Sequence, residues 1–224
     1  MTFSFGATKE EARMPLPGDD IVRTPLLEIA RAITINAPAE RIWRWLSQMG
    51  QGRAGFYSDS PWWDAAVDFY YRVLSREQGR TQVRYEKRDT GIVPEWQDLR
   101  IGDAILDGPP GTAYYVVRQS EPTRSLVLFT DTHLPYLLPS RLRNRVSAEL
   151  TDALILIRLT DSQTRVVRRV RMACRPLAFR LLAVPVVLIW GEITARNFLR
   201  GVKRRAEMGS LTEAGTPSDR SESS

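Results

Sequence analysis

Five apolar segments that alternate like β-strands follow one another between residues 100 and 174, and this succession limits the fold more than any other feature. Turns of Gly, Pro and polar residues separate them. Tight turns join antiparallel strands, whereas parallel strands need crossovers of about a dozen residues or more. We therefore predict an antiparallel meander built from residues 100–107, 112–119, 125–131, 153–161 and 164–174.

Helical patterns flank this run of strands. Residues 28–37 alternate as a first strand, and a helix follows over residues 38–49. A second helix is predicted over residues 61–74 and a last one over residues 176–207, where Pro185 predicts a break or kink. These elements together describe an α+β fold in which a curved sheet wraps around a long C-terminal helix and leaves a cavity between them.

Composition excludes several kinds of site. The 224 residues are 43% hydrophobic and carry a formal charge of +6, which is spread along the chain without a nucleic-acid recognition motif. Cys174 is the single cysteine and His133 the single histidine, so a disulfide within the chain and a metal site of several cysteines or histidines are excluded. We expect no metal, no cofactor and no nucleic-acid partner.

The two ends differ from the middle in composition. We expect residues 1–27 to form an extension packed on the domain, residues 28–208 to form the domain, and the Ser-rich residues 209–224 to be a disordered tail. The N-terminus carries early acidic residues and no apolar segment of the kind found in secretory signals. Together with the single cysteine, this predicts a cytoplasmic protein.

Five stretches of the chain carry motifs that occur together in one superfamily. They are GATKEEARMPLPGDD (6–20), RAITINAPAERIWRWLSQMGQGRAGFYS (31–58), IVPEWQDLRIGD (92–103), TRVVRRVRM (164–172) and LRGVKRRAE (199–207). On these motifs the chain resembles the START-like helix-grip superfamily, or SRPBCC, which includes lipid-transfer domains and polyketide cyclases, and within it an uncharacterised bacterial branch. The resemblance implies a helix-grip fold with a cavity for a hydrophobic ligand, and it names neither substrate nor reaction.

The stretch GQGRAGFYS (50–58) follows the first helix directly. Its glycines allow positive φ and close backbone approach, so the helix can end there and the chain can turn tightly. The structural interpretation is a helix stop, with Tyr57 tucked under the sheet. The functional alternative is a loop at the cavity mouth, where Arg53 meets a ligand carboxylate or phosphate and Tyr57 helps to gate access. We favour the structural interpretation.

The strand TRVVRRVRMAC (164–174) places its arginines on both faces. Three of them share one face, whereas Arg168 falls among the apolar residues of the other face. A buried guanidinium needs a partner. That partner is either a protein carboxylate, with Glu192 and Asp98 as candidates, or an acidic ligand. A β-bulge within the strand would reverse the phase and remove the argument.

Two residues are weak candidates for acid/base chemistry. His133 titrates near neutrality in its unperturbed state, and Glu95 lies close to Asp98 beside an apolar stretch. We favour exposed loop positions as the explanation of both residues. The sequence contains no GxSxG motif, so it gives no support to Ser/His/Asp catalysis.

Binding or transfer of a small hydrophobic or amphipathic ligand is the function that these observations favour. Besides Arg53, Tyr57 and Arg168, the candidate ligand-binding residues are Trp96, Tyr115, Trp190 and Asn197, all of which would also serve as ordinary core residues. One alternative is an enzyme of polyketide-cyclase or dehydratase type that uses the same cavity. Another is a membrane-surface protein, because residues 177–190 form an apolar run that is too short for a spanning helix of about 20 residues.

Overall fold

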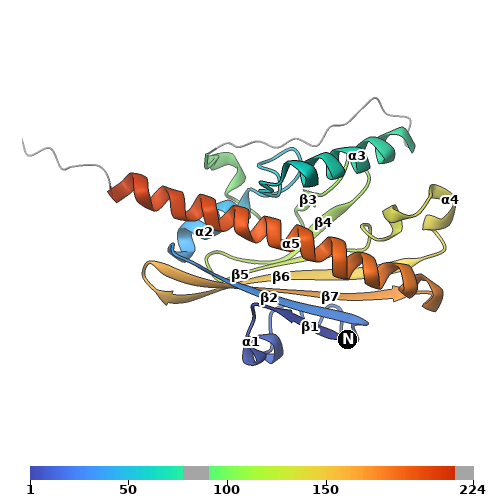
Figure 1. Cartoon of the computed structure of the whole chain (residues 1–224), viewed down its shortest axis with the longest axis horizontal. Helices are drawn as coiled ribbons and strands as arrows, with labels where there is room; N and C mark the ends of the chain where they lie inside the picture. Colours follow the sequence, from blue (N-terminus) through green and yellow to red (C-terminus); the bar gives the residue numbers. More distant parts are fainter. Residues whose placement is uncertain (78–90, 215–224) are drawn as a thin grey trace, which may run out of the picture.

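The computed structural model describes residues 1–77 and 91–214, and a seven-stranded sheet is its largest element (Figure 1). The strand order is β1-β2-β7-β6-β5-β4-β3. β1 is parallel to β2, and the other neighbouring pairs are antiparallel, which confirms the predicted meander. The strands are β1 (Thr2–Phe5), β2 (Leu27–Ile35), β3 (Ala104–Leu106), β4 (Tyr114–Glu121), β5 (Ser125–Thr130), β6 (Ser147–Thr160) and β7 (Gln163–Arg175).

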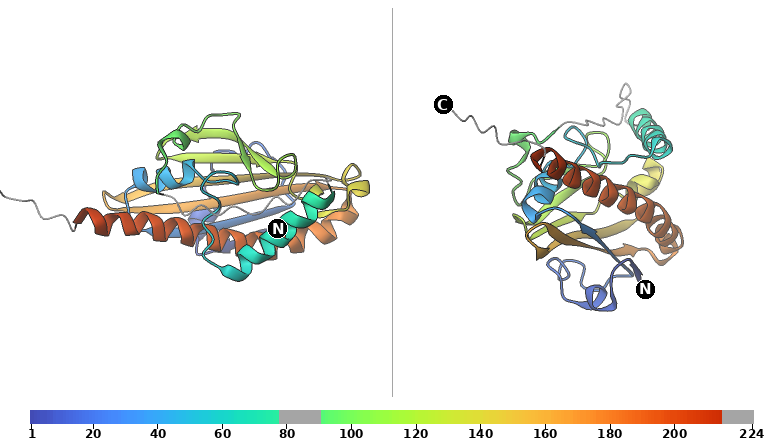
Figure 2. Two further views of the ribbon diagram at one scale, coloured as in Figure 1. Left: turned by 90° about the horizontal axis from the view of Figure 1, so that it is seen from above. Right: turned by 60° about the vertical axis from the view of Figure 1, so that its left-hand side comes forward.

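The helices cover the two faces of this sheet unequally (Figures 1 and 2). The long helix α5 crosses one face together with α2 and α3, and we call this the helix face. The short helix α1 and the rest of the N-terminal segment lie on the opposite, outer face. The helices are α1 (Lys9–Arg13), α2 (Ala39–Ser47), α3 (Pro61–Glu77), α4 (Ser140–Arg143) and α5 (Leu177–Ala214). The chain therefore has the expected helix-grip fold, a sheet that curves around its last helix.

Helix α5 joins two separate apolar clusters on the helix face. Its first half packs with β2 and the end of β7, and its second half packs with α2 and the middle strands. The helix continues through Pro185 without the predicted break. Proline removes one backbone hydrogen bond to the carbonyl of Leu181, and both residues are exposed, so that carbonyl lies on the solvent side of the helix. The helix runs to Ala214, and the rest of the predicted tail lies outside the described residues.

The arginines of β7 divide between the two faces as the sequence pattern predicts. Arg168 lies on the helix face, directly opposite Leu154 of β6. Three of the other arginines bind carboxylates of the outer face, of which Glu11 and Asp19 belong to the N-terminal segment and Glu28 to β2. Arg165 Nε is 2.7 Å from Glu11 Oε1, Arg169 Nη1 is 2.8 Å from Asp19 Oδ2, and Arg171 Nη1 is 3.1 Å from Glu28 Oε2.

The loop GQGRAGFYS rests directly on α5. A side chain at Gly201 of α5 would place its Cβ 1.8 Å from the carbonyl oxygen of Tyr57, so only glycine allows this contact. Gly50 has a φ of 121°, which lets the chain reverse after α2. The Tyr57 side chain is buried and donates a hydrogen bond of 2.7 Å to the carbonyl of Trp45. The structure thus gives this loop the helix stop and buried tyrosine of the structural interpretation.

Candidate ligand cavity

A cavity of about 540 Å³ lies between the helix face of the sheet, α3 and α5. This volume falls within the range of about 300–1,000 Å³ that is typical of small-molecule sites. β2 and β7 form its floor, α5 one wall, and α3 covers it from the side. Most of the lining is apolar or aromatic, including Ile29, Phe56, Trp63, Val67, Leu134, Val170, Val187 and Trp190.

Arg168 is the charged group at the floor of the cavity. Its Nε donates a hydrogen bond of 2.8 Å to Asp152 Oδ1, and its Nη2 bonds the second oxygen of the same carboxylate. Asp152 lies on β6 opposite Val170, so it occupies the same face as Arg168 and one step along the sheet. Burial opposes the charge on Arg168, but Asp152 keeps the pKa of the guanidinium above its usual value. The pair is therefore a buried ion pair without net charge.

Two donors of the cavity lining remain unpartnered. Arg168 Nη1 and Asn197 Nδ2 are buried, and neither has a hydrogen-bond partner among the described residues. Arg168 also lies 5.8 Å from the ring centroid of Phe198, the residue after Asn197, so the strand and the helix that carry the two donors meet at this cavity. Buried donors without partners are rare and costly in native proteins. A ligand acceptor at this place would satisfy them.

A second ion pair connects the sheet to α5 at the cavity. Arg31 of β2 pairs with Glu192 of α5, and Arg31 lies directly opposite Arg168 in the strand register. Burial lowers the pKa of Arg31, and the nearby Arg168 and other cations lower it further. Each arginine therefore has its own carboxylate, which offsets the repulsion between two cations on neighbouring strands.

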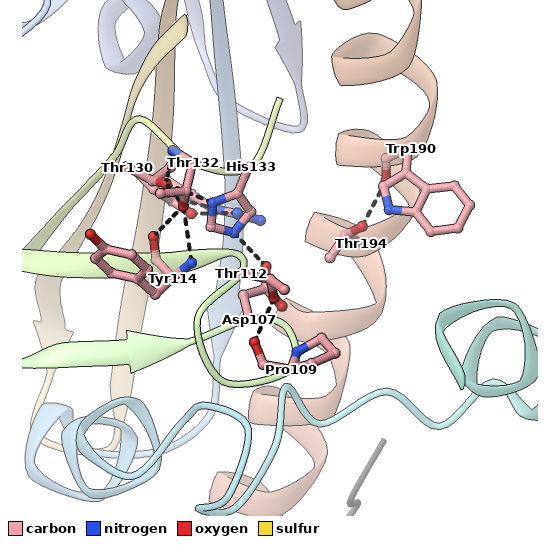
Figure 3. A network of polar contacts seen from close by, with 11 residues as sticks. Asp107, Pro109, Thr112, Tyr114, Thr130, Thr132, His133, Trp190 and Thr194 are labelled. Carbon is pink, nitrogen blue, oxygen red and sulfur yellow. Dashed lines mark hydrogen bonds and ion pairs between the residues drawn. The ribbon is translucent and has the colours of Figure 1, made fainter. Parts of the chain in front are cut away.

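His133 lies at another side of the cavity in a hydrogen-bonded network (Figure 3). Its Nε2 is 2.9 Å from Asp107 Oδ2, and its Nδ1 is 2.7 Å from Thr130 Oγ1. The imidazole ring also packs against Tyr115 at 4.3 Å between centroids. Burial raises the pKa of the Tyr115 phenol well above its usual value, and the carboxylates of Asp107 and Asp152 add to this shift. Tyr115 is therefore a neutral phenol near neutral pH.

The structure brings five of the nine predicted site residues together around this cavity. Tyr115, His133, Arg168, Trp190 and Asn197 all line it. They come from β4, the loop after β5, β7 and α5, which are far apart in the sequence.

The other four predicted residues lie outside the lining. Arg53 donates a hydrogen bond of 2.8 Å from Nη2 to the carbonyl of Trp96, and burial lowers its pKa. The Trp96 ring packs on the edge of the core formed with α2. Tyr57 is buried beneath the Phe198 ring at 6.1 Å, and Glu95 is exposed in the short 3₁₀ turn Pro94–Trp96. Arg53 and Trp96 thus fix one loop to another instead of facing the cavity.

Sequence reasoning missed both carboxylate partners. The partner of Arg168 is Asp152, and neither Glu192 nor Asp98 takes that place, because Glu192 pairs with Arg31 and Asp98 with Arg100. The strand prediction began at residue 153, whereas β6 begins at Ser147. On the longer strand, Asp152 is a carboxylate on the apolar face, next to the strand that carries Arg168. That position was the signal that could have identified it as the partner. No comparable pattern marks Asp107, which reaches His133 across a separation of 26 residues.

A larger depression of about 810 Å³ lies on the outer face between the N-terminal segment and β7. Its charged groups include Arg169, Arg171, Asp19 and Glu28, which are joined to one another by ion pairs. Lys9 and Arg13 add positive charge to its lining. The cavity of the helix face is the better candidate for a ligand site, because its lining is mostly apolar and a drug-sized ligand is normally bound by such a lining with a few polar groups. Among residues 1–77 and 91–214, no cluster of three or more His, Cys, Asp or Glu residues could hold a metal ion.

No family model and no curated protein matches the chain. Similar solved structures include the Aha1 dimer from Colwellia psychrerythraea, with 14% identity, a TM-score of 0.39, and coverage of 82% of this chain and 98% of that chain. PFC0360w, an HSP90 activator from Plasmodium falciparum, shows 10% identity, a TM-score of 0.39, and coverage of 79% and 93%. DynU16, a protein in the dynemicin biosynthetic locus, shows 11% identity, a TM-score of 0.39, and coverage of 81% and 48%. These likenesses concern the fold alone.

Proposed function

We propose that this protein binds a small, largely apolar molecule in the cavity of the helix face, and that the molecule presents a hydrogen-bond acceptor to Arg168 and Asn197. The observation that carries the proposal is the pair of buried, unpartnered donors in an otherwise apolar lining. Apolar burial would supply most of the affinity, at about 25 cal/mol per Å² removed from water. The two donors would fix the orientation of the ligand.

The charge balance favours a neutral acceptor such as a ketone, ester or ether oxygen. Asp152 already compensates the charge of Arg168, and Glu192 compensates that of Arg31. A ligand carboxylate would add an uncompensated negative charge to a buried site, which is costly. An oxygen acceptor without charge completes the hydrogen bonds of both donors without this cost.

Native mass spectrometry of the purified protein, followed by organic extraction, tests the proposal directly. We expect a bound apolar molecule in near-stoichiometric amount. Asn197→Leu keeps the approximate shape of the side chain but removes its donor, so it should reduce the retained amount several-fold, whereas Asn144→Leu on the exposed end of α4 should not. A protein that is empty after gentle purification and takes up no apolar probe would contradict the proposal.

Proton transfer on the bound molecule is the second candidate function, and the His133–Asp107 pair beside the cavity favours it. A histidine held by a carboxylate is a common arrangement for a general acid or base. Binding without reaction ranks first because Thr130 and Asp107 already occupy both ring nitrogens. Incubation of the extracted molecule with wild type and with His133→Gln separates the two candidates: a mass change or rearrangement that only wild type produces would establish the reaction.

A further inference from the structure

The first half of α5 exposes an apolar stripe to solvent. Leu181 is 82% exposed, Ile189 65%, and the spacing of four residues through Pro185 places all three on one side of the helix. Residues 162–191 contain no Asp or Glu, and Arg180 is the one charged residue in the first fourteen positions of α5. A helix that is apolar on all sides is normally buried, so this exposed side is unusual for a protein in water.

Helix α3 extends this apolar surface beside α5 (Figures 1 and 2). Trp62 is 62% exposed and Phe69 is 69% exposed, and their spacing of seven residues puts them on the same side of α3. Trp62 contacts Trp63 at 5.6 Å, and Trp63 contacts Trp190 of α5 at 4.2 Å between ring centroids. The two exposed stripes therefore meet at a cluster of three tryptophans. We call the whole surface the tryptophan face: Trp62, Phe69, Val73, Leu181, Leu182, Ile189 and Trp190.

We propose that the tryptophan face docks on the surface of an anionic phospholipid membrane, with α5 lying in the interfacial plane. By length and composition alone, residues Ala178–Met208 could also cross a membrane. The opposite side of the same helix argues for docking, because Ala183, Val187 and Ala195 are buried against the domain. An interfacial helix keeps these contacts and still buries its exposed stripe, and tryptophan is the side chain that prefers this interface.

Positive charge continues the same outward stripe of α5. Arg196 and Arg200 follow Ile189 at steps of seven and four residues, and both are exposed. Among the described residues, neither pairs with a carboxylate. The stripe therefore changes from apolar to basic along one helix, which complements an apolar membrane interior bordered by anionic headgroups. A two-fold dimer centred on the stripe would place these arginines against the apolar half of the partner helix, which offers them no carboxylate and gives a poorer match.

The tryptophan face also adjoins the cavity. Ile189 and Trp190 both line the cavity and are 65% and 42% exposed. A docked protein would therefore hold this wall of the cavity at the membrane, where apolar molecules partition. The rest of the tryptophan face that the test changes lies outside the cavity lining, so docking can be tested independently of whether the cavity holds a ligand.

Flotation with unilamellar vesicles tests the proposal. Wild type should float with vesicles of phosphatidylcholine and phosphatidylglycerol, and about tenfold less with phosphatidylcholine alone. Binding to the vesicles that contain phosphatidylglycerol should weaken in about 1 M salt, where the Debye length is about 3 Å. Leu181→Ser/Leu182→Ser and Trp62→Ser/Phe69→Ser should each weaken binding about tenfold or more, since each removes large exposed apolar side chains that lie outside the cavity lining.

Matched variants separate docking from general effects of hydrophobicity or charge. Ile101→Ser/Leu159→Ser removes two exposed apolar side chains outside the tryptophan face and should leave flotation unchanged. Arg196→Glu/Arg200→Glu should weaken flotation about tenfold. Arg13→Glu/Arg23→Glu, an equal charge change among exposed residues of the N-terminal segment, should weaken it no more than twofold. Unchanged thermal unfolding and unchanged uptake of an apolar fluorescent probe would show that each variant keeps its fold and its cavity.

Three outcomes would overturn the proposal. The first is a wild type that does not float with either kind of vesicle. The second is equal loss of flotation in the tryptophan-face variants and their matched controls. The third is a stable dimer, detected by light scattering, that the tryptophan-face variants dissociate while vesicles capture nothing, because a second copy would then cover this surface.

Discussion

The two faces of β7 present the same residue type in opposite situations. On the outer face, Arg169 is buried and bonds Asp19 and two backbone carbonyls of the N-terminal segment. On the helix face, Arg168 has one carboxylate and keeps a buried donor without a partner in an apolar cavity. Arg169 Nε is also a buried donor without a partner among the described residues, so neither burial nor an unused donor alone identifies a binding site. What distinguishes Arg168 is that its unused donor belongs to the lining of a mostly apolar cavity.

The largest expected effect concerns the outer face. Arg169→Met removes a buried guanidinium that holds residues of the N-terminal segment, and we expect a loss of about 3 kcal/mol in the free energy of unfolding. Chemical denaturation measures it, with the exposed Arg13→Met as a control that should change stability by less than about 0.5 kcal/mol. Uptake of an apolar probe should stay unchanged. A loss of probe binding in Arg169→Met would break the distinction between the two faces.

The helix face should respond in the opposite way. Arg168→Met/Asp152→Leu replaces a buried ion pair by apolar side chains, so stability should stay within about 1 kcal/mol of wild type or rise. Binding of prodan, an aromatic ketone whose fluorescence reports apolar surroundings, should weaken about tenfold because the ketone loses its donor. Binding of N-phenylnaphthylamine, which has no carbonyl, should change little. Equal losses for both probes would mean that Arg168 shapes the cavity without binding an acceptor.

The smallest effect is a pH dependence of the outer face. The hydrogen bond from Arg165 lowers the pKa of Glu11 in the folded protein, below the value of 4.5 taken for the unfolded chain. The ion pair therefore contributes its full stabilisation at pH values above the unfolded-state pKa of 4.5. This contribution disappears as pH falls through the lower folded-state pKa. Glu11→Gln keeps an acceptor for the helix cap and should cost about 0.5 kcal/mol at neutral pH and nothing in strong acid. A constant difference at all pH values would contradict this.

Local periodicity was sufficient to predict the strands from β2 onward, the final helix and the phase of Arg168, because each depends on residues near one another in the sequence. It missed β1 and the first six residues of β6. It was not sufficient for the cavity wall formed by α3 or for the pairs Arg168–Asp152 and His133–Asp107, which depend on register and on loop paths. Arg53 is instructive, since its glycine-rich loop suggested ligand contact. Its guanidinium instead reaches the carbonyl of Trp96, 43 residues away.

Likewise, the exposed apolar stripe of α5 follows from the three-dimensional packing. The sequence shows an apolar run over residues 177–190, but both sides of that helix look alike in the sequence. The structure distinguishes them, because Val187 is buried and Ile189 is 65% exposed. This difference in exposure identifies which side of the helix packs on the domain and which side faces solvent.

The pairing of β2 with β7 has a consequence for how the chain reaches this structure. Leu27 lies opposite Met172, so the sheet closes between strands that are far apart in the sequence, and α5 follows both of them. Closing so long a loop costs entropy before any contact compensates for it, which places folding in the slow range of about milliseconds to seconds. During synthesis, the apolar helix face of the sheet stays uncovered until the last helix leaves the ribosome. This interval is when exposed apolar surface makes the nascent chain most prone to aggregation.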